Sequence, residues 1–279
     1  MTVTDPRAIH APHAYRLLCA LDADVDAALG ADLAALARSR VAMTLDLRPW
    51  QPLDPPDVAA DFAEQFALDV TGVELAPLVP RLGAQLVPFV KALWVIDLGL
   101  RTDVVLARLF GVDIPPRRLA ASSPEPLVFD PFLRAVALLD GLDPLTTELV
   151  RLRVARHHNC RLCKSLRTRA AMAAGGDEAT YDKIDRFADS DLDERQRTAL
   201  ELTEAIVVRP GAIDPSVVER ARAHFTDAEL VELVLDVMRN SANKVAVAFG
   251  ADAPNVADGL QLYDIGPDGG MVMGEPLTV

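Results

Sequence analysis

The chain has 279 residues, of which 51% are hydrophobic, so it is long enough and apolar enough to bury one large core or two ordinary ones. Its formal net charge of -13 argues against nucleic acid as a partner, because nucleic-acid-binding proteins draw most of their affinity from clustered Lys and Arg. The composition also excludes a disordered chain, and the acidity is typical of a soluble protein.

The first third of the chain predicts helices without a chemical motif. Its N-terminus lacks the basic start and apolar centre of a signal peptide, so we expect a cytoplasmic protein. Cys19 lies in an apolar run, residues 15–20, and is expected to be inert core. The most apolar stretch, residues 86–100, contains Lys91 and Asp97 and falls short of the roughly 20 uninterrupted residues that a membrane span requires. It predicts a buried helix, and we expect no membrane partner.

Two fragments of the chain recur at the same offset. Residues 109–115 match residues 248–254, and residues 95–98 match residues 234–237. Each block predicts a long apolar helix that ends at a glycine suited to a left-handed cap and is soon followed by proline. Such colinear matches predict a duplicated chain. The alternative is that two amphipathic helices share these fragments by chance.

The segment from Pro115 to Pro126 is rich in residues that break helices and has no apolar period, so it predicts a linker with a boundary near Pro124. We therefore expect a first half at residues 1–123, a second half at residues 124–258 and a C-terminal tail at residues 259–279. The tail either forms a hairpin around Asp268-Gly269-Gly270 or is loose.

The second half carries clear helix signals. An aspartate precedes a proline at residues 143–144 and 214–215, and Thr226 with Glu229 has the form of a capping box. Apolar residues at three- and four-residue spacing predict helices over residues 144–158, 160–174, 194–207 and 227–249. Because no strand alternation of comparable length precedes the tail, the predicted fold class is all-α.

Two of the three cysteines, Cys160 and Cys163, form a Cys-x-x-Cys pair directly after the helix predicted at residues 144–158. Two thiols at this spacing can close into a disulfide with little rearrangement, so the pair can give up two electrons and be reset by a reductant. Asn159 can end one helix and cap the next, which would leave both cysteines in a first turn whose unpaired amides stabilise a thiolate. The alternative is a pair of buried structural cysteines.

Zinc binding is the competing interpretation, since His157, His158, Cys160 and Cys163 supply soft ligands. Structural zinc sites usually take their ligands from two separated pairs, and the sequence holds no second pair. Adjacent helical residues also point about 100° apart, so the two histidines would not converge on one ion. We expect neither a metal nor a cofactor.

The order of Glu148, Arg153-Val-Ala155, Asn159 and the Cys160–Cys163 pair, followed by an Ala-rich stretch that ends at Gly175-Gly176, resembles the carboxymuconolactone decarboxylase-like superfamily. It is most similar to the alkyl hydroperoxidase D branch. The resemblance implies an all-helical bundle, here duplicated with a degenerate N-terminal half, and a homo-oligomer.

The resemblance also implies roles for individual residues. Cys163 would attack a hydroperoxide and Cys160 would resolve it as a disulfide, while Glu148 would assist proton transfer. A reductant protein or a lipoyl-type dithiol carrier would restore the thiols. Peroxidase members of the family usually carry histidines where this chain has Leu162 and Arg167.

These departures leave two functions open. In the first, the chain is a thiol-dependent peroxidase-like oxidoreductase. Arg167 would add positive charge to its site and could approach Glu148 in an ion pair, and His157 or His158 would join Glu148 in moving protons. In the second, it is a non-peroxidatic family member that acts as an oligomeric interaction module or a redox sensor. A lactone decarboxylase fits less well, because the cysteine pair would have no part in that reaction.

The first half is not expected to carry chemistry. If residues 39–42 correspond to residues 152–155, then Ala35 stands opposite Glu148, while Leu47 and Trp50 stand opposite the two cysteines. The repeat thus predicts a first half that keeps the scaffold and has lost the reactive groups.

Overall fold

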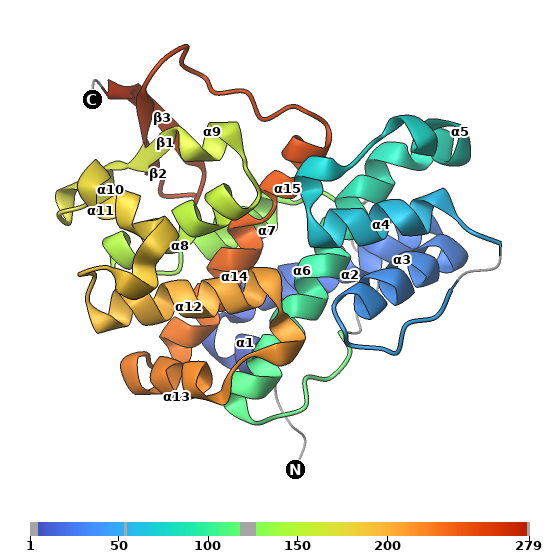
Figure 1. Ribbon diagram of the computed structural model, residues 1–279, viewed down its shortest axis with the longest axis horizontal. Coiled ribbons are helices and arrows are strands. Elements are labelled where there is room, and N and C mark those ends of the chain that lie inside the picture. Colours follow the sequence, from blue (N-terminus) through green and yellow to red (C-terminus); the bar gives the residue numbers. More distant parts are fainter. Residues whose placement is uncertain (1–4, 53–54, 118–126, 278–279) are drawn as a thin grey trace.

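The computed structural model describes residues 5–52, 55–117 and 127–277 (Figure 1). Helices account for 68% of the structure and strands for 6%. The predicted helical class is therefore confirmed in its coarse form, with a small sheet added to it. The proposed boundary near Pro124 lies outside the described residues.

The described part of the first half of the chain is helical. Its α-helices are α1 (Pro6–His10), α2 (Pro12–Leu29), α3 (Ala31–Thr44), α4 (Val58–Leu68), α5 (Val79–Leu82) and α6 (Leu86–Phe110). Three single turns of 3-10 helix lie between α4 and α6, namely η1 (Val70–Gly72), η2 (Ala76–Leu78) and η3 (Gly83–Gln85).

The second half adds the strands. Its helices are α7 (Asp130–Ala137), α8 (Pro144–His157), α9 (Arg161–Lys164), α10 (Arg169–Ala173), α11 (Glu178–Tyr181), η4 (Asp182–Asp189), α12 (Glu194–Val208), η5 (Pro210–Ala212), α13 (Pro215–His224), α14 (Asp227–Asn240) and α15 (Asn243–Ala248). Its strands are β1 (Leu166–Thr168), β2 (Leu260–Ile265) and β3 (Met271–Leu277).

Helices α6 and α14 lie side by side at the centre of the molecule (Figure 1). Trp94 of α6 is fully buried, and its indole nitrogen donates to the Met238 carbonyl of α14 at 3.1 Å. One hydrophobic cluster extends from Ala11 to Ala248, so the two halves share a core. The segment Ala76–Phe110 is apolar and long enough to cross a membrane, but 61% of its most apolar window is buried inside the protein. The predicted buried helix at residues 86–100 is thus confirmed.

A buried cluster of charged side chains also connects the two halves. Asp97 on α6 is fully buried and accepts hydrogen bonds from Arg101 Nε at 2.7 Å and from Lys244 Nζ at 2.6 Å. The Arg101 guanidinium also donates to the Ala67 carbonyl at the end of α4 and to the Val207 carbonyl at the end of α12. Because the C-terminal carbonyls of helices carry partial negative charge, one cation stabilises two helix ends from different halves.

The two halves also pack alike. In the first half α3 contacts α4 and α6, and in the second half α8 contacts α12 and α14. Gly111 follows α6 and Gly250 follows α15, and both adopt the left-handed conformation, with φ of 63° and 64°. As predicted, each repeated fragment holds a glycine in the left-handed conformation; Gly111 is the C-cap of α6, and Gly250 comes one residue after Phe249, the C-cap of the short helix α15.

Two predicted helices are interrupted in the structure. The helix expected at residues 160–174 is wrong, because Leu166–Thr168 leave the helical path and pair in parallel with β2 between the short helices α9 and α10. The helix expected at residues 227–249 breaks after Asn240 into α14 and α15. Asn240 and Ser241, at the break, are both poor helix formers.

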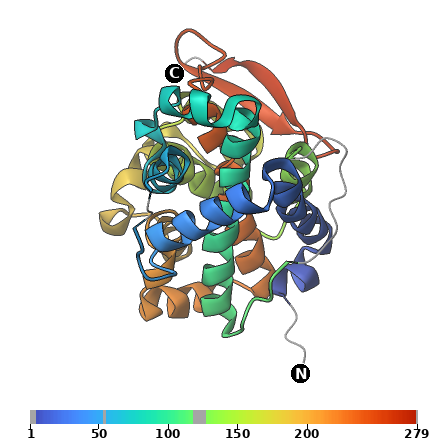
Figure 2. The same cartoon turned by 90° about the vertical axis from the view of Figure 1, so that its right-hand side faces the viewer.

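The C-terminal residues form a hairpin, one of the two predicted possibilities. Strand β2 pairs antiparallel with β3, and the two form the red-orange ribbon pair in Figure 2. The sheet order is β1-β2-β3. Gly269, in the turn, has a φ of 78°, and Asp268 accepts the Gly270 amide at 3.0 Å. This turn chemistry is typical of a tight connection between strands. The hairpin lies over the segment that contains the cysteine pair.

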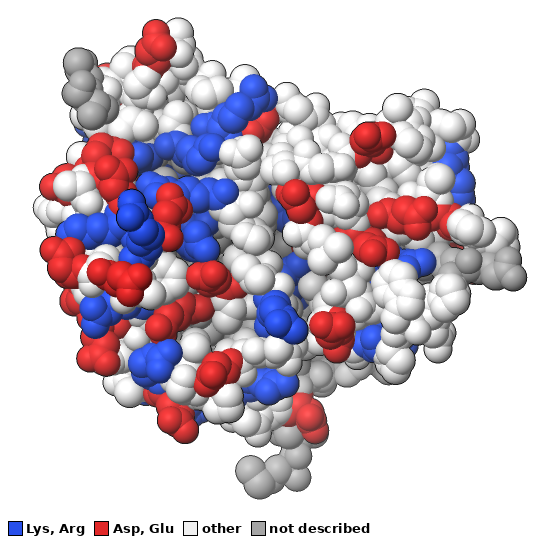
Figure 3. Space-filling view, viewed as in Figure 1, with Lys and Arg blue, Asp and Glu red and all other residues white. Residues whose placement is uncertain are grey.

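The charged side chains are mixed on the face shown in Figure 3. Lys and Arg lie among Asp and Glu, most densely on the left-hand side of the view, where α9 to α12 lie in Figure 1. A surface that binds a polyanion would present one sign of charge over a continuous area. The face in view does not.

Candidate dithiol site

The turn between α8 and α9 positions the cysteine pair. Helix α8 ends at His157, and Asn159 adopts a left-handed φ of 51°, which directs the chain into α9. Asn159 does not cap α9 as the sequence predicted. Cys160 is the cap residue, and its sulfur accepts the Cys163 amide at 3.2 Å, while the Asn159 side chain accepts from Lys164. Since α9 has only four residues, its dipole contributes little to the site.

Cys160 and Cys163 are joined in a disulfide, with their Cα atoms 5.3 Å apart. Cys160 is 1% exposed, whereas Cys163 is partly exposed. Cys19 is a free, buried cysteine in α2, as predicted for a core residue. The two sulfurs of the motif therefore differ in access, and Cys163 is the one that a molecule in solution can reach.

Cys163 borders a cavity of about 460 Å³ between α7, the α14–α15 region and the hairpin turn, and a smaller one of about 130 Å³ that extends toward Tyr263. We call these two together the Cys163 pocket. Both parts are lined by Leu162, Cys163, Arg239, Asn240, Asn243 and Met271. The sulfur thus faces a space large enough for a small organic molecule.

Asn243, which the sequence analysis missed, contacts the outer sulfur. Its Nδ2 donates to Cys163 Sγ at 3.6 Å, and its Oδ1 lies 2.9 Å from His158 Nδ1. Because Oδ1 can only accept, His158 carries its proton on Nδ1 in this arrangement. The residue belongs to α15, 80 positions beyond Cys163. Its position between the repeated fragments at residues 234–237 and 248–254 was its only signal in the sequence.

His158 is buried and uncharged. Burial lowers its pKa well below the usual 6.5, and the nearby positive charge of Lys244 acts in the same direction. Burial likewise lowers the pKa of His157 to about 4, with further contributions from Lys244 and Arg101. The His157 ring lies edge-on to His158, with centroids 5.1 Å apart. Of the two predicted histidines, the structure brings only His158 to the dithiol, through Asn243.

The residues considered as zinc ligands make other contacts in the structure. Within the described ranges no group of three or more His, Cys, Asp or Glu side chains is arranged to hold a metal. The Nδ1 atom of His158 is occupied by Asn243, and both sulfurs are in the disulfide.

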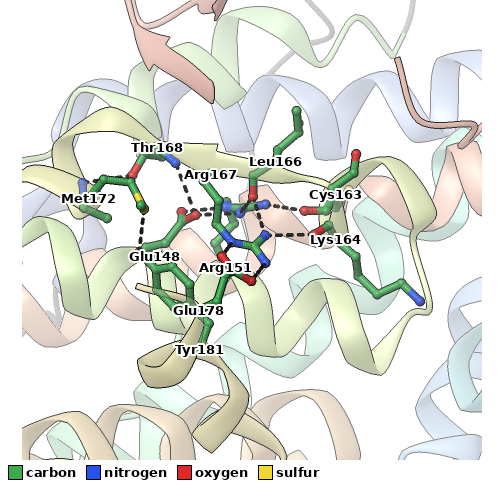
Figure 4. A network of polar contacts seen from close by, with 12 residues as sticks. Glu148, Arg151, Cys163, Lys164, Leu166, Arg167, Thr168, Met172, Glu178 and Tyr181 are labelled. Atoms are coloured by element: carbon green, nitrogen blue, oxygen red, sulfur yellow. Dashed lines mark hydrogen bonds and ion pairs between the residues drawn. The ribbon is translucent and has the colours of Figure 1, made fainter. Parts of the chain in front are cut away.

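Glu148 is buried on α8 and bound by Arg151 (Figure 4). Both carboxylate oxygens accept from the Arg151 guanidinium at 2.7 Å, and Oε1 also accepts the Thr168 amide at 3.3 Å. Burial opposes the charge on Arg151, but Glu148 holds its pKa above the usual value. Glu148 lines a different cavity from Cys163, so it reaches the dithiol only through its partner.

Arg151 connects this ion pair to the cysteine segment. Its Nη1 donates to the Cys163 carbonyl at 2.8 Å and its Nη2 to the Leu166 carbonyl at 2.6 Å (Figure 4). A single guanidinium therefore holds two backbone carbonyls of this segment, those of Cys163 and Leu166. The bidentate geometry makes arginine, and not lysine, the side chain that can do this.

Arg167 lies elsewhere than predicted. It pairs with Glu178 through two contacts of 2.7 Å, and its Nη1 donates to the Lys164 and Leu166 carbonyls (Figure 4). The expected approach of Arg167 to Glu148 is wrong, because Arg151, three residues after Glu148 on the same helix, already occupies that carboxylate. The guanidinium of Arg167 also lies 5.1 Å from the centre of the Tyr181 ring.

Asp252, which follows α15, holds the turn that contains the cysteine pair. It accepts the Arg161 amide at 2.8 Å and pairs with the Arg161 guanidinium at 2.7 Å, and its carbonyl accepts the Leu162 amide. The hydrogen bond from Arg161 lowers the pKa of Asp252. Asp252 belongs to one of the repeated fragments, so the repeat supplies part of the support for the site.

Leu47 and Trp50, which the sequence analysis set opposite the two cysteines, do not form a comparable site. Trp50 is 54% exposed and lies against the Arg40 guanidinium, 4.4 Å from ring centroid to carbon, while Leu47 packs against the core. Neither residue has a group that can cycle between redox states.

No family model and no solved structure matches the chain. The uncharacterized protein Rv2313c of Mycobacterium tuberculosis strain H37Rv is 40% identical over 260 residues, which cover 89% of this chain and 92% of that protein, and MT2376 of strain CDC 1551 matches equally well. The uncharacterized protein YdfG of Bacillus subtilis is 30% identical over 113 residues, or 39% of this chain and 77% of YdfG. The chain therefore belongs to the family that includes Rv2313c and YdfG.

Proposed function

We propose that this protein is a cytoplasmic thiol-dependent oxidoreductase that reduces hydroperoxides through a cycle of the Cys160–Cys163 dithiol and disulfide. The observation that carries the proposal is the unequal access of the two sulfurs. Cys163 is partly exposed, borders both parts of the pocket and receives a hydrogen bond from Asn243, whereas Cys160 is 1% exposed and borders only the larger part. The sequence resemblance to the alkyl hydroperoxidase D branch supports the same division of roles.

The reaction has two steps in which atoms and electrons balance. In the first, the Cys163 thiolate attacks the distal oxygen of the hydroperoxide, and the oxygen–oxygen bond breaks. The alcohol leaves with a proton from solvent, and Cys163 becomes a sulfenic acid. In the second, the sulfur of Cys160 attacks Cys163, water leaves, and the disulfide forms. A reductant protein or a lipoyl-type dithiol then supplies two electrons and two protons to restore the thiols.

Asn243 and His158 take the place of a histidine that touches the sulfur. Hydrogen bonds to the charged form of a group favour that form, so the Asn243 amide stabilises the Cys163 thiolate. The hydrogen bond from His158 holds the amide with its nitrogen toward the sulfur. Because burial keeps His158 neutral, it orients Asn243 and does not serve as the proton donor.

Glu148 acts as a positioning residue in this proposal. Its carboxylate neutralises Arg151, and Arg151 holds the carbonyls of Cys163 and Leu166. The network supports the backbone beneath the outer cysteine, whereas the family resemblance assigned this glutamate a part in proton transfer. Arg167 and Glu178 support the next turn of the same segment.

The test is the reaction of the reduced protein with one equivalent of cumene hydroperoxide in a stopped-flow instrument. We expect both motif thiols to be consumed, with one equivalent of cumyl alcohol formed, at a rate far above that of free cysteine. The Cys19→Ser variant is the matched control and should react like the unchanged protein, because Cys19 is buried in α2. A rate equal to that of free cysteine would contradict the proposal.

A second function is favoured by one observation. Leu162 and Arg167 replace the histidines of peroxidase members, and Arg167 is fully engaged by Glu178 and backbone carbonyls. A chain of this kind could serve as a redox sensor or an oligomeric interaction module. In that case the disulfide would form slowly with peroxide, and oxidation would change the subunit count measured by light scattering.

A duplication is also part of this proposal. The repeated fragments, the glycine caps and the equivalent packing of α3 and α8 support it. YdfG supports it too, because 113 matched residues make up 77% of that protein, which is therefore about half as long as this chain. On this view the first half is a degenerate copy that provides core and the second copy carries the dithiol.

A further inference from the structure

A second cavity lies beside the Cys163 pocket. It has a volume of about 370 Å³ and is enclosed by the end of α7, the start of α8, α14 and β2. Arg151, Arg239 and Tyr263 line both this cavity and the smaller part of the Cys163 pocket. We call it the Asp236 cavity. Most of its wall is apolar and is formed by Val136, Leu139, Leu142, Pro144, Ala170 and Ile265.

Asp236 is a buried carboxyl group without a partner. It is 3% exposed and lines the cavity, and its carboxyl group forms no hydrogen bond or ion pair with any residue that the structure describes. Burial raises the pKa of Asp236 to about 7, an effect that Arg239 reduces and Glu232 reinforces. Near neutral pH a large part of this group is therefore a neutral acid that can donate a hydrogen bond.

Arg239 is the arginine of the cavity wall that has no anionic partner among the described residues. Its Nε donates to the Leu133 carbonyl at 3.1 Å, and its guanidinium forms no ion pair within the described part of the chain. Arg151, the other arginine in the wall, is bound by Glu148 and by two carbonyls. Half-buried arginines are usually paired, so an unpaired guanidinium beside a neutral acid indicates a missing anion.

Most of the other charged groups in the wall already have partners, since Asp264 pairs with Arg169, and Asp140, which has no partner among the described residues, is exposed to solvent. Glu148 and Arg151 neutralise each other across the cavity, and burial raises the pKa of Tyr263, so it stays a neutral phenol. The titratable or charged groups that face Asp236 are Glu232 and Arg239 from α14, Glu148 and Arg151 from α8, Tyr263 and Asp264 from β2, and Asp140 from the segment after α7.

We propose that the Asp236 cavity binds a small monocarboxylate with an apolar body. The ligand's carboxylate accepts hydrogen bonds from the Arg239 guanidinium and from the acid form of Asp236, and its hydrocarbon part lies against the apolar wall. An amine would be repelled by Arg239, and an uncharged alcohol would leave the guanidinium unpaired. The site needs no thiol chemistry, so it does not rest on the function proposed above.

Binding of the carboxylate would be linked to protons. An anion beside Asp236 favours its neutral form, so the ligand should raise the fraction of protonated Asp236 and take up a proton from solution. Affinity should fall as the pH rises from about 6 to about 8.5, because Asp236 loses its proton over this range. An apolar pocket without a titrating carboxyl group would bind the carboxylate with the same affinity at both pH values.

The test is isothermal titration calorimetry with octanoate, octanol and octylamine as probes. We expect octanoate to bind, with proton uptake near pH 7.5 measured in two buffers of different ionisation enthalpy, and the other two probes to bind at least about tenfold more weakly. Arg239→Met should weaken octanoate binding by about tenfold or more. Arg108→Met, at an exposed arginine outside the cavity, is the matched control and should bind like the unchanged protein.

Three further variants test the parts of the site separately. Asp236→Asn keeps a neutral hydrogen-bond donor, so this variant should still bind octanoate. Binding should then take up no proton, and the affinity should not fall at high pH. Ala137→Phe should fill the cavity and block binding without removing a charge. A Cys160→Ser, Cys163→Ser variant should bind normally, which distinguishes this site from the thiol chemistry. Unchanged affinity in a folded Arg239→Met variant, equal binding of octanol, or no binding of octanoate would overturn the proposal.

Discussion

Asn243 donates a hydrogen bond to the sulfur of Cys163 from a helix 80 residues further along the chain. The amide is held in this orientation by His158, which donates to its oxygen at 2.9 Å. The contact connects the outer cysteine to the α14–α15 region, and through the neighbouring Lys244 to Asp97 of the first half. The reactivity of the dithiol is therefore tied to the packing of both halves.

Replacing Asn243 should slow the thiol. In Asn243→Ala the Cys163 thiolate loses a charge-assisted hydrogen bond, so we expect alkylation of the reduced protein by iodoacetamide to slow by about tenfold near neutral pH. The rate profile should also move to higher pH. Asn240→Ala, in the same pocket but bonded to a backbone carbonyl, is the matched control. Equal rates for the two variants would show that the amide does not act on the sulfur.

The two cysteines should differ in their chemistry. Cys163→Ser should abolish the reaction with hydroperoxide, because the exposed sulfur is gone. Cys160→Ser should still react once and stop at a sulfenic acid that dimedone traps. Mass spectrometry of the oxidised, unchanged protein should find one peptide that contains both linked cysteines. Loss of the reaction in both variants without a trapped adduct would reverse or remove the assigned order.

Arg167 should matter for stability more than for chemistry. Its guanidinium is buried against Glu178 and two carbonyls, so Arg167→Met should lower the free energy of unfolding by roughly 2 kcal/mol. The alkylation rate of Cys163 should change little, and Arg167→His should not create a proton relay. Urea unfolding measures the first effect, with Lys183→Met at a more exposed ion pair as the control. A large change in thiol reactivity at unchanged stability would contradict this assignment.

Asp236 should make stability depend on pH. Burial raises its pKa to about 7 in the folded protein, whereas an unfolded aspartate titrates near 3.9. Between these values the folded state binds more protons, so this group's contribution to stability is full at low pH and is lost as the pH rises through about 7. Asp236→Asn should therefore be more stable than the unchanged protein at about pH 8, by at most roughly 4 kcal/mol, and not at about pH 4.

Thermal unfolding of the two proteins at both pH values checks this expectation. Asp140→Asn, at an exposed aspartate in the wall of the same cavity, should give no pH-dependent difference. The same gain from Asp236→Asn at both pH values would mean that the substitution acts through packing and not through ionisation.

Breaking the charge cluster between the halves should destabilise the whole chain. Asp97→Ala leaves Lys244 buried without its partner, and removing one member of a buried pair costs roughly 3–5 kcal/mol. A double variant, Asp97→Leu with Lys244→Met, should recover only the part of the loss that comes from Lys244, because Arg101 has lost its carboxylate partner in both variants. Chemical unfolding should show one transition in both. Two separate transitions, or no loss in Asp97→Ala, would contradict a shared core.

The sequence by itself determined the features that depend on neighbours along the chain. Helices α8, α12 and α14 begin where Asp143, Asp193 and Thr226 supply a side-chain oxygen to the first-turn amides. These signals lie within a few residues of each helix start, so local pattern is enough to locate most of them. The cysteine pair, its disulfide and the buried Cys19 were predictable for the same reason.

The tertiary structure decided every feature that needed a distant partner. Strand β1 exists because Leu166–Thr168 find β2 some 95 residues away, and no local pattern marks them as a strand. Arg151 and Arg167 were both able to reach Glu148 by spacing, and only packing assigned one to Glu148 and the other to Glu178. Asn243 and Asp236 gain their roles from what faces them across the core. Pairing and burial are set by three-dimensional neighbours, which the order of residues constrains only weakly.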